Sequence, residues 1–215
     1  MAEIVSYSAS EVEKVAQRVK TVIQRGGLVA IPTETYYGLG VDPFNSVAVD
    51  RLLTVKGREE GKPILVLIGS LSQLSLVAHA VPPAASVLID AFWPGPLTIL
   101  FPAHPSLPSN VTAGTGSVGV RFSSCQPLCE LLQRIGPLTG TSANHSGAPP
   151  AQTPQAVQKD LRDEVELIID GGATPGGLPS TVVEVRGTPR IIREGVIARA
   201  AIEALLRTRG FFLNV

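Results

Sequence analysis

The chain has 215 residues, a length that suits one large domain and can bury a hydrophobic core without disulfide bonds. Its 18 lysines and arginines balance 18 aspartates and glutamates, so no general electrostatic field attracts nucleic acid or an anionic membrane. The N-terminal segment carries acidic residues early, and no apolar run reaches the ~20 residues of a membrane span. We therefore expect a cytoplasmic protein with no membrane contact, in which any anion site is local.

The predicted elements alternate between helices and strands. Ser8 and Glu11 form a capping box at the start of the first amphipathic segment. Apolar spacing and turn signals predict helices at 12–23, 46–56, 71–78, from Pro83 onward, and near 125–135, 153–161 and 197–208. Short apolar runs predict strands at 28–33, 63–68, 97–101, 118–122, 166–170, 180–185 and 190–194.

This alternation indicates an α/β fold. The last three strands follow one another with only turns between them, so we expect one twisted mixed sheet with parallel and antiparallel pairs and flanking helices. No repeat or linker divides the chain, which predicts a single domain over 1–209 and a C-terminal tail over 210–215. Binding residues are expected in the loops rich in glycine and proline at 93–97, 110–116, 146–154 and 171–180.

The two cysteines, Cys125 and Cys129, lie four residues apart in a predicted helix. They are too close for an easy disulfide across one helical turn and too few for a disulfide scaffold, so we expect buried, reduced thiols. The three histidines stand in separate segments. We therefore predict no metal site built by the protein.

Three cations, Lys56, Arg58 and Lys62, precede the apolar strand that begins at Ile64. Charges at the entrance of a buried strand either solvate a loop or bind an anion. The segment KGREEGK lacks the spacing and the terminal hydroxyl of the phosphate-binding motif G-x-x-x-x-G-K-S/T. A P-loop nucleotidase is therefore unsupported.

The stretch GTGSVG at 114–119 matches G-x-G-x-x-G, but it runs into the alternating strand residues Val118, Val120 and Phe122 instead of a helix. We reject a dinucleotide-binding unit for that reason. Arg121 lies on the other face of this strand, where it is either exposed to solvent or, if it points inward, paired with an anion or a carboxylate.

Hydroxyl groups gather where predicted strands end. PTETYYGLG at 32–40 supplies Thr33, Thr35 and Tyr37, and ligands of open α/β sheets bind beyond the carboxyl ends of strands. These residue types are also ordinary strand formers. GTSAN at 140–144 and STVVEV at 180–185 supply further hydroxyls, and the absence of a G-x-S-x-G elbow argues against a covalent nucleophile.

Taken in order, these segments resemble the TsaC/YrdC family of threonylcarbamoyl-AMP synthases. PTETYYGLG is similar to the family's PT(E/D)TxYGL, KGREEGKP to K-x-R-x-x-x-x-P, and GTSAN to S-x-N. WPGPLT, VGVRF, IIDGG, STVVEV and IIREG match in sequence and spacing as well. The likeness extends from about residue 10 to 205 and indicates the short, single-domain form.

The resemblance implies a deep cavity that binds ATP, L-threonine and bicarbonate. It implies catalytic roles for Lys56, Arg58, Ser142 and Asn144. It implies ATP contacts for those four residues together with Lys62, Ser117 and Arg193, and threonine contacts for Thr33, Arg121 and Thr181. Leu67 stands where some longer relatives have a histidine near the amino acid. Mg²⁺ is expected to bridge phosphates of ATP, without a carboxylate cage from the protein.

The implied reaction is the first step of N6-threonylcarbamoyladenosine (t6A) formation in tRNA. The threonine amine attacks bicarbonate or CO2, and the resulting carboxylate attacks the α-phosphate of ATP and expels pyrophosphate. Clustered cations and neutral donors suit this chemistry. The expected downstream partners are threonylcarbamoyl-transferase proteins, with tRNA or another RNA as a further contact.

Two alternatives belong to other classes. One is a structured-RNA-binding or ribosome-maturation module without catalysis, which the neutral net charge and the lack of aromatics on a basic face disfavour. The other is a carbamoyl-transfer relative that activates carbamoyl phosphate, but the acylphosphatase and zinc-finger-like segments expected of such proteins are missing.

Overall fold

The computed structural model describes residues 2–7, 11–57 and 62–214. Ser8 of the predicted capping box and Arg58 of the cation-rich segment lie outside these residues. Within them, the predicted α/β class is confirmed, but the strands form two mixed sheets instead of one.

The first sheet has the strand order β1-β9-β2-β3-β8. Its strands are β1 (Glu3–Ser6), β9 (Leu167–Asp170), β2 (Val29–Ile31), β3 (Gly38–Gly40) and β8 (Thr141–Ser142). Strand β9 pairs in parallel with β1 and β2, whereas β3 is antiparallel to β2 and β8.

The second sheet has the strand order β11-β10-β5-β6-β4-β7. Its strands are β11 (Arg190–Arg193), β10 (Thr181–Glu184), β5 (Leu97–Pro102), β6 (Ser117–Phe122), β4 (Leu65–Ile68) and β7 (Leu138–Thr139). The predicted antiparallel pairing near the C-terminus is found between β10 and β11. Strand β9 does not join them, because residues 171–180 carry the chain from the first sheet to the second.

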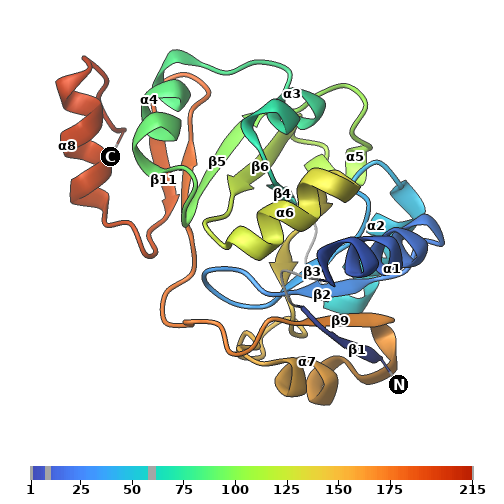
Figure 1. Ribbon diagram of the computed structural model, residues 1–215. Coiled ribbons are helices and arrows are strands. Elements are labelled where there is room, and N and C mark those ends of the chain that lie inside the picture. The colour runs from blue at the N-terminus through green and yellow to red at the C-terminus, as the bar shows by residue number, and fades with distance from the viewer. Residues whose placement is uncertain (1, 8–10, 58–61, 215) are drawn as a thin grey trace.

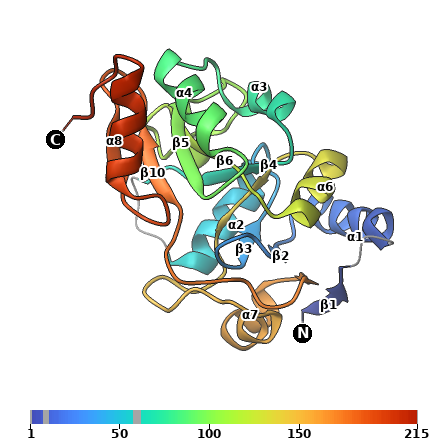
Figure 2. The ribbon, with the colours of Figure 1, turned by 60° about the vertical axis from the view of Figure 1, so that its left-hand side comes forward.

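Helices cover the sheets on several sides (Figures 1 and 2). They are α1 (Val12–Gln24), α2 (Ser46–Lys56), α3 (Leu74–Val77), α4 (Pro83–Phe92), α5 (Ser109–Thr112), α6 (Gln126–Ile135), α7 (Pro154–Leu161) and α8 (Arg199–Thr208). The predicted helix at 71–78 is shorter than expected, because its first turn is a 3-10 helix at Leu71–Gln73. None of the described helices is both long and apolar enough to span a membrane.

Helix α1 shows how the apolar pattern places an element. Its buried residues Val15, Val19 and Ile23 recur on one face, and that face packs with α6 and the first sheet. Both ribbon views show α1 beside α6 (Figures 1 and 2). Each such aliphatic side chain stabilises the fold by about 1.5–3 kcal/mol when it is fully buried.

Helix α2 is capped at both ends, which fixes the position of its last residue, Lys56. The side chain of Asn45 accepts a hydrogen bond from the Ala48 N–H (3.2 Å) and caps the first turn. Gly57 ends the helix with a φ of 55°, in the left-handed region that glycine adopts without strain. Lys56 is therefore the last helical residue.

The cysteines and the C-terminal segment belong to the packed domain. Cys129 is buried in α6, where burial raises the pKa of its thiol to about 12, and Cys125 precedes the helix with a half-buried side chain. At the C-terminus, Phe211 and Leu213 pack against the main hydrophobic cluster, and the Asn214 N–H donates to the Pro189 carbonyl (2.8 Å). The segment predicted as a tail therefore contacts the domain.

Candidate functional site

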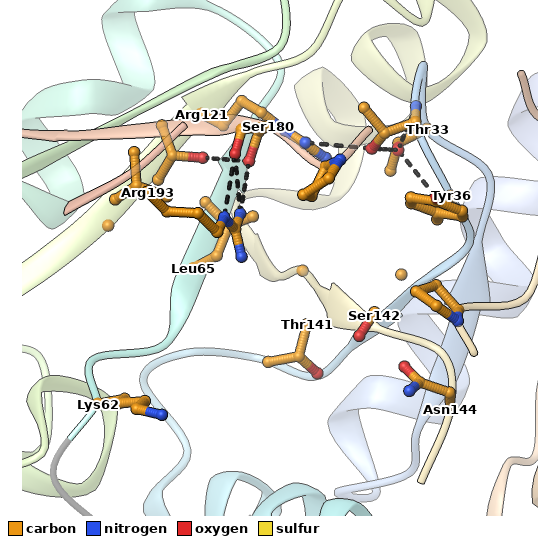
Figure 3. Close-up of a pocket in the computed structure, with 18 of the residues that line it drawn as sticks. Thr33, Tyr36, Lys62, Leu65, Arg121, Thr141, Ser142, Asn144, Ser180 and Arg193 are labelled. Atoms are coloured by element: carbon orange, nitrogen blue, oxygen red, sulfur yellow. Dashed lines mark hydrogen bonds between the residues drawn. The ribbon is translucent and has the colours of Figure 1, made fainter. Parts of the chain in front are cut away.

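A cavity of about 620 Å³ is lined by residues from both sheets. The first sheet contributes the segments around β3 and β8, and the second contributes residues of β4, β5, β6, β10 and β11. This volume is in the range of pockets that bind small-molecule ligands and cofactors. Figure 3 shows Arg121, Ser180 and Arg193 along one side of the open space and Thr141, Ser142 and Asn144 along the opposite side.

We call the first group, Arg121 with Arg193 and Ser180, the arginine side. The lysine side consists of Lys56, Lys62, Ser142 and Asn144, all of which line the same cavity.

The lysine side is built around a buried ammonium group. Lys56 is only 6% exposed, and its Nζ donates to the Ser142 carbonyl (2.6 Å) and to Asn144 Oδ1 (3.1 Å). The Ser142 hydroxyl (3.4 Å) and the Asn144 carbonyl are further acceptors. An ammonium has three N–H donors, so the protein itself satisfies this lysine. The expected convergence of Lys56 with Ser142 and Asn144 is therefore observed.

Asn144 fixes the loop that follows β8. Its Nδ2 donates to the carbonyls of His145 (2.8 Å) and Ala148 (2.6 Å), and the Ser146 N–H donates to the Lys56 carbonyl (2.9 Å). His145 contacts the Val55 carbonyl through Nδ1 (3.0 Å) and Glu164 through Nε2 (3.4 Å). These contacts use both ring nitrogens away from Ser142, so the two residues do not form a nucleophile and base.

On the arginine side, Arg121 points inward and is 3% exposed. Its Nε lies 3.5 Å from Glu34 Oε1 in an ion pair, and its NH1 donates to Thr35 Oγ1 (3.3 Å). Burial lowers the pKa of the Arg121 guanidinium, and the negative charge of Glu34 opposes that shift. Of the two sequence-based alternatives, the inward arginine with a carboxylate partner is confirmed.

The hydroxyls beside Arg121 form a chain with a fixed direction. Thr33 Oγ1 donates to the Tyr36 carbonyl (2.8 Å), so its hydrogen is not available to Thr35 Oγ1, 3.0 Å away. The Thr35 hydroxyl must then donate to Thr33 and accept from Arg121. Figure 3 shows this chain running from Arg121 toward Tyr36.

Arg193 reaches the cavity from the end of β11. Its Nε and NH2 donate to the Ser180 carbonyl (3.3 and 2.9 Å), and NH2 also lies 3.3 Å from Ser180 Oγ. Burial lowers the pKa of the Arg193 guanidinium, and the like charge of Arg121 lowers it further. Two guanidinium groups thus line this side of the cavity, an arrangement that favours an anionic ligand.

Thr181 is placed differently from its implied threonine contact. It is fully buried and does not line the cavity. Its hydroxyl donates to the Ile197 carbonyl (2.7 Å) and accepts from the N–H groups of Gly195 (2.9 Å) and Ile197 (3.1 Å). Successive side chains of a strand point to opposite faces, so Ser180, the neighbour of Thr181, is the residue that faces the cavity.

Ser117 is also placed differently from its implied ATP contact. It opens β6 opposite Pro102, is 2% exposed, and is not among the residues that line the cavity. Gly119, two positions further along the same face, does line it. A Cβ at Gly119 would lie 3.3 Å from Thr98 Cγ2, a tight contact, so the packing at this position favours glycine.

The cavity is lined by two further residues named by the resemblance, Thr33 and Lys62, but not by Leu67. Thr33 lines the cavity near Arg121, and Lys62 lines it as an exposed residue just before β4. Leu67 is fully buried and packs on Gly140, where a Cβ would lie 2.6 Å from the leucine side chain. Leu65, not Leu67, is the residue of β4 that lines the cavity.

The sequence did not identify several lining residues. Tyr36, Thr98 and Thr141 all face the cavity, and Thr141 Oγ1 is a buried hydroxyl without a hydrogen-bond partner in the part of the chain that the structure describes. Thr98 lies within WPGPLT and Thr141 within GTSAN, so the signal available for them was their position inside these segments.

The family model Sua5/YciO/YrdC, described as "Telomere recombination", matches residues 21–195. The chain belongs to this family. Its relatives include a putative threonylcarbamoyl-AMP synthase of Mycobacterium tuberculosis, 37% identical over 86% of this chain and 85% of that protein. The threonylcarbamoyl-AMP synthase of Pseudomonas aeruginosa is 37% identical over 83% of this chain and 96% of that protein.

Solved structures of the family have the same fold. The structure of Pyrococcus abyssi Sua5 complexed with L-threonine matches with a TM-score of 0.89 and 33% identity, covering 100% of this chain and 62% of that one. The chain thus spans about three fifths of that longer family member. Escherichia coli YciO matches with a TM-score of 0.81 at 24% identity, which bears on the fold alone.

Proposed function

We propose that this chain is a threonylcarbamoyl-AMP synthase, which converts L-threonine, bicarbonate or CO2, and ATP into threonylcarbamoyl-AMP and pyrophosphate. Curated relatives with this activity in their names align over most of the chain, and a structural neighbour has been solved with L-threonine. The observation that carries the proposal is one cavity with a buried arginine on one side and a lysine-centred polar loop on the other.

Arg121 is the proposed partner of the threonine carboxylate. Its guanidinium is buried, lines the cavity, and offers the planar donor arrangement that matches a carboxylate. Thr33 and Thr35 line the same part of the cavity and supply hydroxyl oxygens near the bound amino acid. Ser180 replaces Thr181 in this proposal because its side chain faces the cavity.

The triphosphate is proposed to lie between the lysine side and Arg193. Lys62, Ser142 and Asn144 line that region, and Lys56 adds a buried positive charge while it holds the loop in place. Arg58 lies outside the described residues, so its implied role stays a prediction. The ATP contact implied for Ser117 also stays a prediction, because Ser117 is not among the residues that line the cavity.

Both chemical steps bring negative charges together. The threonine amine forms a C–N bond with CO2 and releases a proton, or with bicarbonate and releases water. One oxygen of the new carbamate then attacks the α-phosphorus as the bond to pyrophosphate breaks. Cations fixed by the fold stabilise the charge on the phosphate oxygens without a cost of reorganisation. The partly enclosed cavity also protects the labile carbamate from water.

Mg²⁺ is proposed to enter with ATP. The described cavity residues supply hydroxyls, amides and cations but no carboxylate, and the described part of the chain holds no group of three His, Cys, Asp or Glu side chains placed to bind a metal. This donor set fits a metal that is bound chiefly through substrate phosphates. The product would pass to a threonylcarbamoyl-transferase partner that modifies tRNA, which completes the proposed place of the reaction in t6A synthesis.

Pyrophosphate release tests the proposal. Purified protein with ATP, L-threonine and bicarbonate should release pyrophosphate and form threonylcarbamoyl-AMP, detected by mass spectrometry. Omission of threonine or bicarbonate should abolish both signals. An RNA-binding module without catalysis would give neither signal in the complete mixture, and that result would overturn the assignment.

A further inference from the structure

Glu34 lies behind Arg121, outside the set of residues that line the cavity. It follows β2 in the segment PTET, and its side chain is 13% exposed. Its Oε1 faces Arg121 Nε at 3.5 Å, and its Oε2 accepts a hydrogen bond from the Ser123 hydroxyl. The carboxylate of Glu34 therefore touches the arginine but not the space where a ligand would bind.

The orientation of Glu34 is itself fixed by the protein. Ser123 is fully buried, and its Oγ accepts a hydrogen bond from the Cys125 N–H (3.1 Å). Its own hydrogen is therefore directed to Glu34. Ser123 and Cys125 connect β6 to α6, so this chain of contacts ties the carboxylate to the second sheet, although Glu34 follows a strand of the first.

This arrangement constrains the guanidinium of Arg121 on two sides. Glu34 lies at Nε, and Thr35 accepts from NH1. A buried guanidinium without a nearby negative charge would be strongly disfavoured. Among the described residues, however, neither Arg121 Nε nor Glu34 Oε1 has a hydrogen-bond partner. The two groups therefore form an ion pair at 3.5 Å without a hydrogen bond between them.

We propose that Glu34 is a positioning residue that holds Arg121 in the orientation needed to bind the carboxylate of the amino-acid substrate. It does so without touching the substrate, by neutralising the buried guanidinium and occupying its Nε edge. This inference rests on the proposed function. Glu34, which connects the two sheets, would thereby contribute to the binding of threonine.

The decisive variant is Glu34→Ala, assayed in full-length protein by pyrophosphate release. Loss of the ion pair should raise the KM for L-threonine at least about tenfold, as expected when a charged contact is lost. The KM for ATP should change less than about twofold, and kcat at saturating threonine less than about threefold, because the reacting groups stay in place. Glu34→Gln, which keeps the shape and the Ser123 contact, should give an intermediate KM for threonine.

Glu184→Ala is the matched control. Glu184 has a similar exposure (17%) and pairs with Arg186 (3.2 Å) and Arg190 (2.9 Å), but it does not line the cavity or contact Arg121. This variant should leave the KM for threonine unchanged. Thermal unfolding of all variants reports whether a kinetic change reflects a loss of folded protein.

The outcomes separate the two claims. If wild-type protein forms no threonylcarbamoyl-AMP, the proposed function fails. If wild-type protein is active and Glu34→Ala raises both KM values equally or leaves the threonine KM unchanged, the positioning role is overturned. Should Glu34→Ala not fold, Glu34→Gln and Ser123→Ala decide by the same criterion, since each weakens a contact of the carboxylate.

Discussion

Lys56 and Arg121 are both buried cations that line one cavity, but the protein satisfies them to different degrees. Lys56 Nζ has four acceptor oxygens from Ser142 and Asn144 around its three N–H donors. In the described part of the chain, Arg121 makes one hydrogen bond, to Thr35, and its Nε forms an ion pair with Glu34 at 3.5 Å but no hydrogen bond. The protein itself satisfies the N–H donors of Lys56, whereas it leaves donors of Arg121 without a hydrogen bond in the described part of the chain.

The difference separates two uses of a buried charge. On the lysine side, the ammonium connects the end of α2 to the loop after β8 and so builds the shape of the site. On the arginine side, the guanidinium lines the cavity and donates only to Thr35 among the described residues, so a ligand carboxylate would supply further acceptors for its NH groups. We therefore expect changes on the two sides to differ in whether stability or substrate affinity suffers.

The largest effect is expected from Arg121→Ala. Removal of a buried charged partner costs about 3–5 kcal/mol, so kcat/KM for threonine should fall by roughly two to four orders of magnitude. Steady-state kinetics with varied threonine and saturating ATP measures this loss. Arg190→Ala, an exposed arginine of β11 in the same sheet, is the control and should retain wild-type kinetics. Equal kinetics for Arg121→Ala and wild type would contradict a role of Arg121 in the binding of threonine.

A comparison of Lys56→Met with Lys62→Met sharpens the contrast on the lysine side. Lys56→Met leaves buried acceptor oxygens without their donor, so the free energy of unfolding should fall by about 2–4 kcal/mol, together with activity. Lys62 is exposed, so its replacement should raise the KM for ATP with little change in stability. Urea denaturation measures the first effect and steady-state kinetics the second. An unchanged stability for Lys56→Met would contradict the structural role.

The smallest effect on activity is expected from Thr181→Val. The substitution keeps the shape but removes three hydrogen bonds to the segment 195–197, which should lower the free energy of unfolding by about 1–3 kcal/mol. The KM for threonine should remain that of wild type, since the side chain points away from the cavity. A selective rise in that KM would restore Thr181 as a substrate contact.

The sequence predicted those parts of the fold that depend on local patterns. The apolar spacing in 46–56 predicted a helix that ends at Lys56, and α2 has these bounds. The alternation in β6 predicted that Arg121 lies on the face opposite to Val120. The family motifs predicted that Ser142 and Asn144 lie near Lys56. These features need only helix and strand periodicity and short motifs.

Features that depend on contacts between distant segments were not predictable in the same way. The division into two sheets follows from the path of residues 171–180, which have no periodic pattern. The choice between Ser180 and Thr181 depends on which face of β10 meets the cavity, and adjacent hydroxyl residues give no signal of that. Glu34 and Arg121 meet across the two sheets, a pairing that neither segment reveals alone.

The most direct measurement is a crystal structure of the protein with L-threonine and a non-hydrolysable ATP analogue. We predict the amino-acid carboxylate on the Arg121 guanidinium, with Glu34 still behind it, and the triphosphate between Arg193 and the loop that Lys56 holds. A threonine bound elsewhere, or a triphosphate outside the cavity between the two sheets, would contradict the account.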